Sequence, residues 1–126
     1  MKNVTLEWIK KAEQDFLVAE REYKEKPPAY DAVCFHAQQC IEKYMKAVLQ
    51  ENDVFFEKTH DLDLLLEQCK KFIPELSNYK RDLIDLSSFA VEVRYPGILA
   101  TIDEAREAIT IMEKIRTIIR EYWKIS

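Results

Sequence analysis

The sequence predicts an all-α protein, an up-and-down antiparallel bundle of four long helices and a short one. Apolar side chains recur at intervals of three and four residues through every long segment, which is the period of an amphipathic helix. The chain has only one Gly and four Pro among 126 residues, so it is poor in the residues that tight β-turns need. Because one hydrophobic core can serve a chain of this length, we expect residues 1–126 to form a single domain.

Two long helices are expected in the first half of the chain. The first runs from Thr5, a suitable N-cap, to about Lys24, and its core-facing stripe comprises Leu6, Ile9, Ala12, Phe16, Ala19 and Tyr23. Pro27 and Pro28 end it, because the residue before a proline disfavours the α conformation. The second helix runs from about Ala29 to Gln50, with a stripe of Tyr30, Val33, Cys34, Ala37, Cys40, Ile41, Tyr44 and Val48.

The middle of the chain predicts two more helices and an irregular connection. Capping side chains at residues 59–61 precede a short helix that carries Leu62, Leu65, Leu66, Cys69 and Phe72 and ends at Pro74. A fourth helix is expected from about Leu76 to Ala90. Residues 91–97 should connect it irregularly to the next element, since Pro96 and Gly97 are strong helix breakers.

The last helix opens with a capping box, Thr101 to Glu104, and has Arg116, Arg120 and Lys124 near its negative end. Its apolar residues are Ala105, Ala108, Ile109, Ile111, Met112, Ile115, Ile118, Ile119, Tyr122 and Trp123. This stripe is wider than one core face of a small bundle requires. We therefore expect part of it to face a second copy of the chain, giving a homodimer.

Composition excludes several classes of protein. The formal net charge of -4 creates no overall field that attracts a phosphate backbone, so contact with nucleic acid would need a local patch. The cysteines, Cys34, Cys40 and Cys69, are odd in number and form no C-x-x-C pair, which predicts neither a disulfide framework nor a thiolate zinc site. We interpret them as buried, reduced thiols. No segment approaches the ~20 apolar residues of a membrane span and no signal peptide is evident, so we expect a cytoplasmic protein with no membrane contact.

One face of the second helix combines polar side chains that could bind a ligand. His36, Gln39 and Lys43 are spaced i, i+3 and i+7, and Lys46 lies close to the same line. Lysine supplies charge for a phosphate, while histidine and glutamine supply orientable hydrogen-bond donors for a base edge. Two interpretations remain open: a groove that binds a nucleotide, or a solvated helix face with one histidine.

Two charges elsewhere suggest further roles. Arg94 and Tyr95 lie in the predicted irregular segment, an arrangement expected of a phosphate contact beside an aromatic platform. Arg94 could instead pair with a helix C-terminus or with Glu92. Asp15 stands within an apolar stripe, so we expect Lys43 or Arg94 to partner it in support of the site; the alternative is a capped surface residue.

His60 and Asp61 also permit two interpretations. A carboxylate can fix the tautomer of an imidazole, so the pair could be a general base and its orienter. Both directly precede an apolar-periodic segment, where side-chain acceptors satisfy unpaired N–H groups, and a capping role is more economical. Metal binding by His36 and His60 would need ligands that the sequence does not place nearby, so we predict no metal and no cofactor.

Four segments resemble, in matching order, the HEPN domain family, the "higher eukaryotes and prokaryotes nucleotide-binding" domain. Residues 35–49, FHAQQCIEKYMKAVL, resemble its signature helix. The others are Ala12 with Asp15, the THDL segment at 59–62, and the RYP segment at 94–96. The resemblance implies a bundle like the C-terminal domain of kanamycin nucleotidyltransferase, commonly dimeric and often encoded beside a minimal nucleotidyltransferase, as in toxin–antitoxin pairs.

Many members of that family are metal-independent endoribonucleases that use an Arg followed, after four to six residues, by a His. Here the corresponding positions after Arg94 are Leu99, Ala100 and Thr101, so that pair is absent and we predict no catalytic residue. The predicted function is a nucleotide- or RNA-binding module. Its contact residues are His36, Gln39, Lys43, Lys46, Arg94 and Tyr95, supported by Asp15, Glu42, His60 and Asp61. The alternatives are an endoribonuclease toxin in which His36 or His60 replaces the missing histidine, and a helical scaffold without a ligand.

Overall fold

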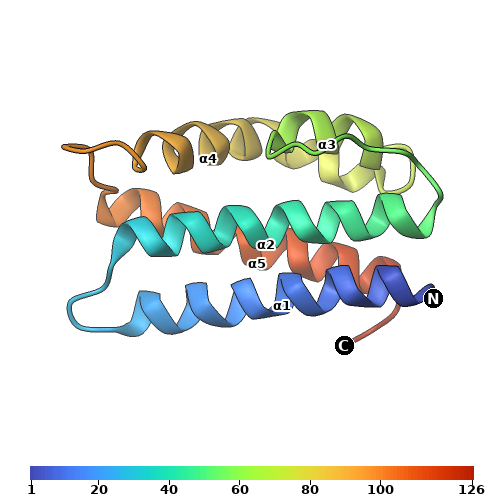
Figure 1. The fold of residues 1–126 in the computed structure, drawn as a ribbon, viewed down its shortest axis with the longest axis horizontal. Coiled ribbons are helices and arrows are strands. Elements are labelled where there is room, and N and C mark those ends of the chain that lie inside the picture. The colour runs from blue at the N-terminus through green and yellow to red at the C-terminus, as the bar shows by residue number, and fades with distance from the viewer.

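The computed structural model describes all 126 residues and contains helices but no strand. Four helices of 13 to 22 residues run alternately in opposite directions: α1 (Asn3–Lys24), α2 (Tyr30–Glu51), α4 (Lys80–Glu92) and α5 (Ile102–Tyr122) (Figure 1). Between α2 and α4 lie the short helix α3 (Leu62–Cys69) and a 3-10 turn, η1 (Pro74–Tyr79). The predicted up-and-down helical bundle is therefore confirmed.

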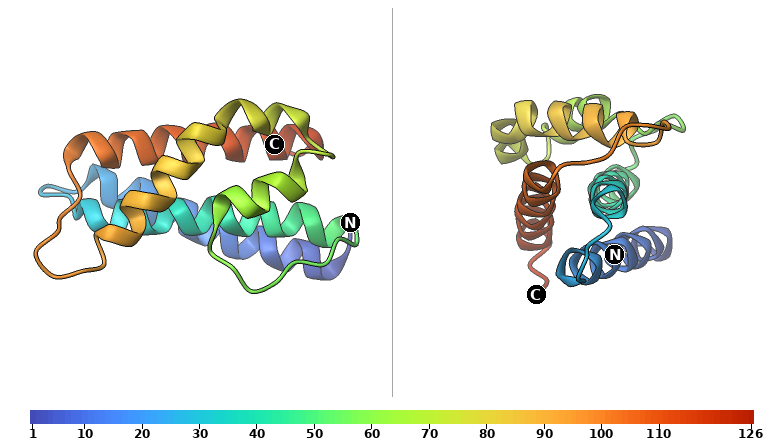
Figure 2. Two further views of the ribbon diagram at one scale, coloured as in Figure 1. Left: turned by 90° about the horizontal axis from the view of Figure 1, so that it is seen from above. Right: turned by 90° about the vertical axis from the view of Figure 1, so that its left-hand side faces the viewer.

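Helix α2 is the centre of the bundle and contacts α1, α3, α4 and α5. In the end-on view of Figure 2, α2 lies between α1 on one side and α4 on the other, with α5 next to it. On its apolar side, Ile41, Tyr44 and Val48 are completely buried. Because neighbours surround the helix, three of its polar side chains are buried as well: Gln38, Glu42 and Lys46.

The start of α1 differs from the prediction. The helix begins at Asn3, and Thr5 is a buried residue of its first turn instead of the N-cap. The Thr5 hydroxyl donates to Oε1 of Glu51 at 2.9 Å, and the backbone N–H of Lys2 donates to the same oxygen at 3.0 Å. A long-range acceptor at the end of α2 therefore replaces the local cap that Thr5 suggested.

The predicted fourth helix is divided in two. Pro74 begins η1 rather than ending α3, whose last residue is Cys69, and α4 starts only at Lys80. Proline suits the first turn of a helix because it has no N–H to leave unpaired there. At the other end α4 continues to Glu92, so the irregular connection begins at residue 93 instead of residue 91; Gly97, with a φ of +87°, lies within it.

Helix α5 begins as predicted but is covered more completely. The capping box is present: Thr101 Oγ1 accepts from the N–H of Glu104 at 3.0 Å, and the Glu104 side chain accepts from the N–H of Thr101 at 2.9 Å. The expectation of a surplus apolar face is wrong, because α1, α2, η1 and α4 all pack against this helix. Eight of its apolar residues are buried within the chain, and only Ile102 and Tyr122 at its two ends are exposed.

The three cysteines are buried and unpaired, as expected of small apolar side chains. Burial raises the pKa of Cys34 and of Cys69 to about 12 and also raises that of Cys40. A thiol must ionise to act as a nucleophile, so none of the three is chemically active near neutral pH. No helix has both the length and the apolar character needed to span a bilayer.

Candidate functional site

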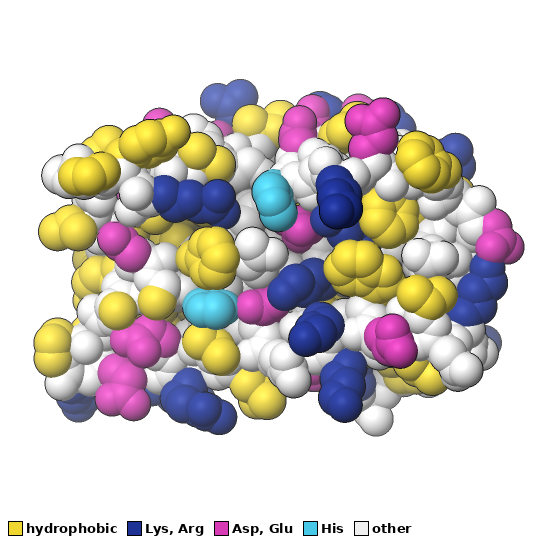
Figure 3. Space-filling model, viewed as in Figure 1, with side chains coloured by type: hydrophobic (Ala, Val, Ile, Leu, Met, Phe, Trp, Pro, Cys, Tyr) yellow, Lys and Arg dark blue, Asp and Glu magenta, His cyan; other side chains and the backbone are white.

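The polar side of α2 faces the gap between α1 and the segment that leads into α3 and α4. We call His36, Gln39, Glu42, Lys43 and Lys46 the α2 stripe, since their spacing puts them on one side of the helix. Figure 3 shows both histidines of the chain on this face, with basic and acidic side chains next to them. The prediction that His36, Gln39 and Lys43 share a helix face agrees with this arrangement.

Asp15 of α1 joins two members of the stripe. Its Oδ1 lies 2.8 Å from Nδ1 of His36, and its Oδ2 accepts a hydrogen bond of 2.6 Å from Nζ of Lys43. Asp15 is buried, and burying a carboxylate is costly unless it has such partners. Of the two partners considered from the sequence, Lys43 is confirmed and Arg94 is wrong. Because Nδ1 of His36 is occupied, Nε2 remains for contacts outside the chain.

Glu42 repeats this arrangement further along α2. It is only 2% exposed, yet its Oε2 accepts from Nζ of Lys46 at 2.9 Å and its Oε1 lies 2.8 Å from Nδ1 of His60. The side chain of His60 is 67% exposed, so Nε2 of this imidazole also faces solvent. The stripe therefore contains two groups of the same composition, a lysine and a histidine held by one buried carboxylate. We call them the Asp15 group and the Glu42 group.

His60 and Asp61, for which the same two roles were considered, have different roles in the structure. Asp61 is the N-cap of α3 and accepts from the N–H groups of Asp63 at 3.0 Å and Leu64 at 3.4 Å, so its capping role is confirmed. His60 does not cap the helix, and Asp61 does not orient it. The orienting carboxylate is Glu42, eighteen positions earlier in the chain, which no local pattern could indicate.

Two adjacent glutamines of α2 behave differently. Gln39 is half-buried and its side-chain amide makes no hydrogen bond within the chain, so it is available to a ligand. Gln38, which the sequence analysis missed, is buried; its Nε2 donates to the carbonyl of His60 at 2.9 Å, and the Ser87 hydroxyl lies 3.4 Å from its Oε1. Gln38 thus fixes the backbone that carries His60. Gln38 lies on α2 between the apolar side and the α2 stripe, and nothing in the sequence indicates that its side chain reaches the backbone of His60.

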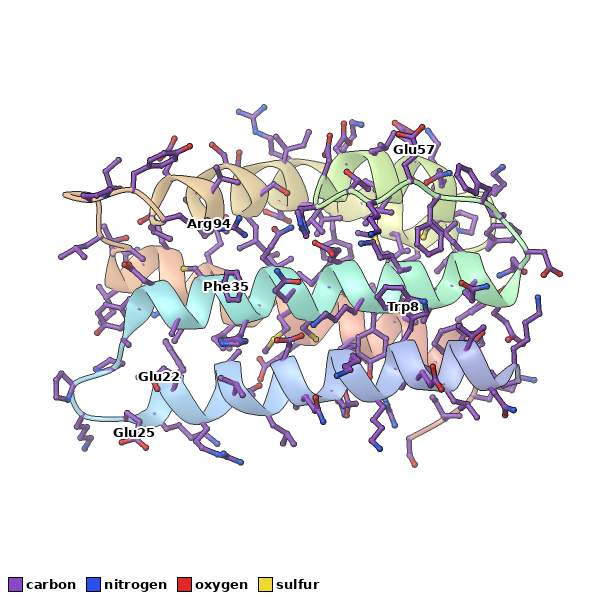
Figure 4. All side chains as sticks on the ribbon, viewed as in Figure 1. Trp8, Glu22, Glu25, Phe35, Glu57 and Arg94 are labelled. Atoms are coloured by element: carbon purple, nitrogen blue, oxygen red, sulfur yellow. The ribbon has the colours of Figure 1, made fainter.

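Arg94 lies above α2, but not on the aromatic ring predicted for it. Its Cζ is 5.2 Å from the ring centre of Phe35, and Figure 4 shows the two side chains facing one another between α4 and α2. The Phe35 ring meets that of His36 edge-on at 5.1 Å. Tyr95 is 63% exposed and does not serve as the platform, and Arg94 forms no ion pair with Glu92. Phe35 was missed because it belongs to a different element.

A shallow hollow adjoins the Glu42 group. Its volume is about 530 Å³, and its lining consists of His60, Asp61, Ile84, Ser87, Ser88, Val91 and Glu92. The exposed imidazole of His60 and two serine hydroxyls provide polar groups at this surface. No set of three or more His, Cys, Asp or Glu side chains in the chain is arranged to hold a metal ion.

The charged side chains of the two groups, taken together with Arg94, differ in net sign from the whole protein. Lys43, Lys46 and Arg94 oppose two carboxylates, those of Asp15 and Glu42, so the formal charge is +1 with neutral histidines, whereas the chain carries -4. Only Arg94 among these cations has no carboxylate partner. Arg94 is therefore the uncompensated cation of this region and the group best able to attract an anion.

A third, partly buried network lies on the other side of α2 and was also missed. Glu13 of α1 accepts two hydrogen bonds of 2.7 Å from Arg116 and one of 2.6 Å from the hydroxyl of Tyr44. Arg120 donates to the same hydroxyl at 2.9 Å. From the sequence, both arginines are expected near the negative end of the last helix. Their main partners instead join α1, α2 and α5.

Comparisons with known proteins agree with this fold. The family model described as the HEPN domain matches residues 5–122, nearly the whole chain. The crystal structure of an archaeal HEPN homologue is similar to this chain, with a TM-score of 0.72 and 26% identity, covering 96% of this chain and 98% of that chain. A search of curated proteins found no significant match.

Proposed function

The chain belongs to the HEPN domain family, and from that premise we propose that it is a homodimeric nucleotide-binding module that works beside a minimal nucleotidyltransferase. The observation that carries nucleotide binding is the α2 stripe with its two lysine–carboxylate–histidine groups. Burying Asp15, Glu42 and Lys46 is expensive in desolvation, and apolar side chains would fill the same space at lower cost.

The proposed contacts follow from what each side chain has left to offer. Arg94 supplies the charge for a phosphate, and Gln39 supplies an unpaired amide for a base edge. The imidazoles of His36 and His60 present Nε2, because each Nδ1 is held by a carboxylate. Lys43 and Lys46 add positive potential, and Tyr95, predicted as a contact, lies next to Arg94 at the end of the stripe.

Titration calorimetry with AMP, ATP and UMP tests the nucleotide site. Arg94→Ala should weaken binding about tenfold, the value of one charge-assisted contact. Lys10→Ala is the matched control, since Lys10 is exposed two residues from Trp8, which puts it on the far side of α1. The absence of binding at millimolar nucleotide would rule out this function, as would equal affinities for the two variants.

Dimerisation needs a surface other than α5, whose apolar stripe is covered. Exposed apolar side chains are concentrated around the connection from α4 to α5: Val91, Tyr95, Ile98, Leu99 and Ile102. Leu99, at 78% exposed, is the most exposed of these. Light scattering after size exclusion should give a dimer for the native chain and a monomer for Leu99→Asp. Leu17→Asp, at an exposed position of α1, should remain dimeric.

The nucleotidyltransferase partner is supported only by what the family resemblance implies. The reading frame next to the gene for this chain is the place to look for it. If that frame encodes a minimal nucleotidyltransferase, co-expression with a tag on one protein should recover both in a fixed ratio. Recovery of the tagged protein alone would remove this part of the proposal and leave nucleotide binding intact.

A second candidate function is metal-independent cleavage of RNA. It is favoured by one specific feature, the two imidazoles that carboxylates hold at Nδ1, because an oriented imidazole can transfer a proton through Nε2. Purified protein should then cleave mixed RNA in the presence of EDTA, and His36→Ala or His60→Ala should abolish the cleavage. Intact RNA after prolonged incubation, or cleavage that survives both substitutions, would exclude it.

A further inference from the structure

An aromatic cluster lies at the far end of the α2 stripe from Arg94. Trp8 of α1 meets Phe56 edge-on, with 6.1 Å between the ring centres, and Nζ of Lys46 lies 5.5 Å from the centre of the Trp8 ring. In Figure 4, Trp8 lies between α1 and α2. Phe55, next in the chain to Phe56, is 82% exposed, the largest exposed fraction of any large apolar side chain in this protein.

The exposure of Phe55 is built into the fold. Its carbonyl accepts a hydrogen bond of 3.0 Å from Nε2 of Gln68, and the N–H of Val54 donates to the carbonyl of Leu49 at 2.9 Å. The backbone on either side is therefore held, while the ring remains in water. Exposing a phenylalanine gives no stability in return.

Trp8 separates two hollows. One, of about 490 Å³, is lined by Trp8, Gln50, Asp53, Val54, Phe55 and Phe56. The other, of about 320 Å³, is lined by Val4, Glu7, Trp8 and Lys11. A planar ligand group can therefore approach the indole from open space, next to a second ring on Phe55.

We infer that Trp8, Phe55 and Phe56 form a stacking subsite for an unpaired base of a single nucleic-acid strand whose phosphates follow the α2 stripe. This inference rests on the proposed function and extends it from a nucleotide to a strand. A cation lies over an aromatic ring at both ends of the stripe, Arg94 over Phe35 and Lys46 over Trp8. Alternating aromatic and basic groups are what single-strand binding sites use.

The dimensions and the polarity of the stripe favour a strand over a protein partner. Positions 35 and 46 are eleven residues apart on α2, or about 16 Å at 1.5 Å per residue, which fits a strand of a few nucleotides. Between these ends lie the charged Asp15 and Glu42 groups. The core of a protein–protein interface is depleted of charged residues. A protein partner that covered the stripe would bury these two charged groups in such a core, which disfavours it.

The test uses 2′-O-methyl oligouridylates from one to eight nucleotides, which cannot be cleaved through a 2′-hydroxyl. Binding should strengthen with length up to about four nucleotides and then level off. Only the longer oligomers should quench the fluorescence of Trp8. Trp123 is the one other tryptophan, so Trp8→Phe shows which residue is quenched and should remove the response. Phe55→Ala should weaken the longer oligomers by about tenfold and leave UMP binding unchanged. Leu17→Ala is the control, as an exposed apolar residue on the opposite side of α1.

Each result decides between the two proposals. If UMP binds with its dependence on Arg94 while Phe55→Ala leaves the longer oligomers unaffected, the stacking subsite is wrong and the nucleotide site stands. If neither UMP nor any oligomer binds, both are wrong. If Phe55→Ala instead disrupts association with a co-expressed nucleotidyltransferase and leaves oligomer binding intact, the aromatic cluster is a protein contact and the inference is overturned.

Discussion

Two carboxylates of α1, Glu13 and Asp15, lie two residues apart and serve different parts of the molecule. Two residues correspond to about 200° around a helix, so the side chains point to different sides of α1. Glu13 pairs with Tyr44 and Arg116, whereas Asp15 pairs with His36 and Lys43. Both are held by hydrogen bonds to charged or polar partners, so the presence of such a network does not by itself identify a functional site.

The difference lies in what the partners have left over. Arg116 binds both oxygens of Glu13 and stacks on Phe16 at 4.1 Å, and Tyr44 also accepts from Arg120. Burial disfavours ionisation of Glu13, but the hydrogen bonds from Arg116 and Tyr44 outweigh it and lower its pKa. That network holds three helices together. In the Asp15 group the imidazole of His36 keeps Nε2 free on the surface, so a ligand can still bind it.

The largest effect on stability is expected from a change in the Glu13 network, which holds helices together. Glu13→Ala removes the acceptor shared by Arg116 and Tyr44 and should lower the free energy of unfolding by about 2 kcal/mol, the cost of lost hydrogen bonds to charged groups. Nucleotide affinity should not change, because the α2 stripe is untouched. Urea titration gives the first value and calorimetry the second. Glu25→Ala, an exposed change at the C-cap of the same helix, is the control; equal stability of the two variants would contradict the assignment.

A matched change on the other side should affect both properties. Lys43→Gln removes the cation that donates to Asp15, and we expect a loss of about 1 kcal/mol in stability because His36 still contacts the carboxylate. Nucleotide affinity should fall as well, since the stripe loses a positive charge. The same two measurements apply. If the variant lost stability but bound nucleotide like the native chain, the Asp15 group would have only a structural role, like the Glu13 network.

Acid should weaken the Glu13 network. Folding lowers the pKa of Glu13 below its ordinary value of 4.5, so its ionisation stabilises the fold above about pH 4.5 and this contribution disappears as the pH falls through the folded-state pKa. The stability difference between the native chain and Glu13→Gln should therefore shrink from pH 6 to about pH 3. Urea midpoints at several pH values measure it. A difference that stayed constant over that range would show that the charge of Glu13 is unimportant.

The smallest effect, a few tenths of a kcal/mol, is expected at the half-buried Glu20, and its dependence on pH has the opposite sign to that of Glu13. Burial, then the nearby carboxyl of Glu113, raise the pKa of Glu20 from 4.5 to about 7. A folded-state pKa above the unfolded one stabilises the fold at low pH, and the contribution is lost as the pH rises from about 4.5 through 7. Glu20→Gln should match the native chain at pH 4 and be more stable at pH 8. Glu25→Gln, the control, should show no such gain in stability at pH 8. A urea midpoint for Glu20→Gln equal to that of the native chain at pH 8 would refute the prediction.

Much of the fold could be predicted because its signals are local. The apolar periodicity of α2 and the Thr101–Glu104 capping box depend on residues within a turn or two, and both appear in the structure. The same holds for Asp61 as an N-cap. The errors came where a local pattern met a distant partner, as with Thr5, whose hydroxyl binds Glu51 instead of capping its own helix.

The candidate site was predictable in its residues but only partly in its contacts. Helical spacing alone places His36, Gln39 and Lys43 on one face, and an isolated carboxylate in an apolar stripe signals the need for a partner at Asp15. The sequence could not show that Glu42 orients His60, or that Phe35 rather than Tyr95 lies under Arg94. Those pairs join residues 18 and 59 positions apart, and only the packing of α4 and of the segment before α3 onto α2 brings them together.

By itself, then, the sequence determined where helices form and which of their sides are apolar, because both are set by spacing along one segment. The tertiary structure decided how much of each apolar side is used, and it covered the stripe of α5 that looked surplus. It also decided which buried carboxylate holds which cation. The physical reason is that a charge or an apolar face is stabilised by whichever group arrives within a few ångströms, and that group is selected by the packing of distant elements.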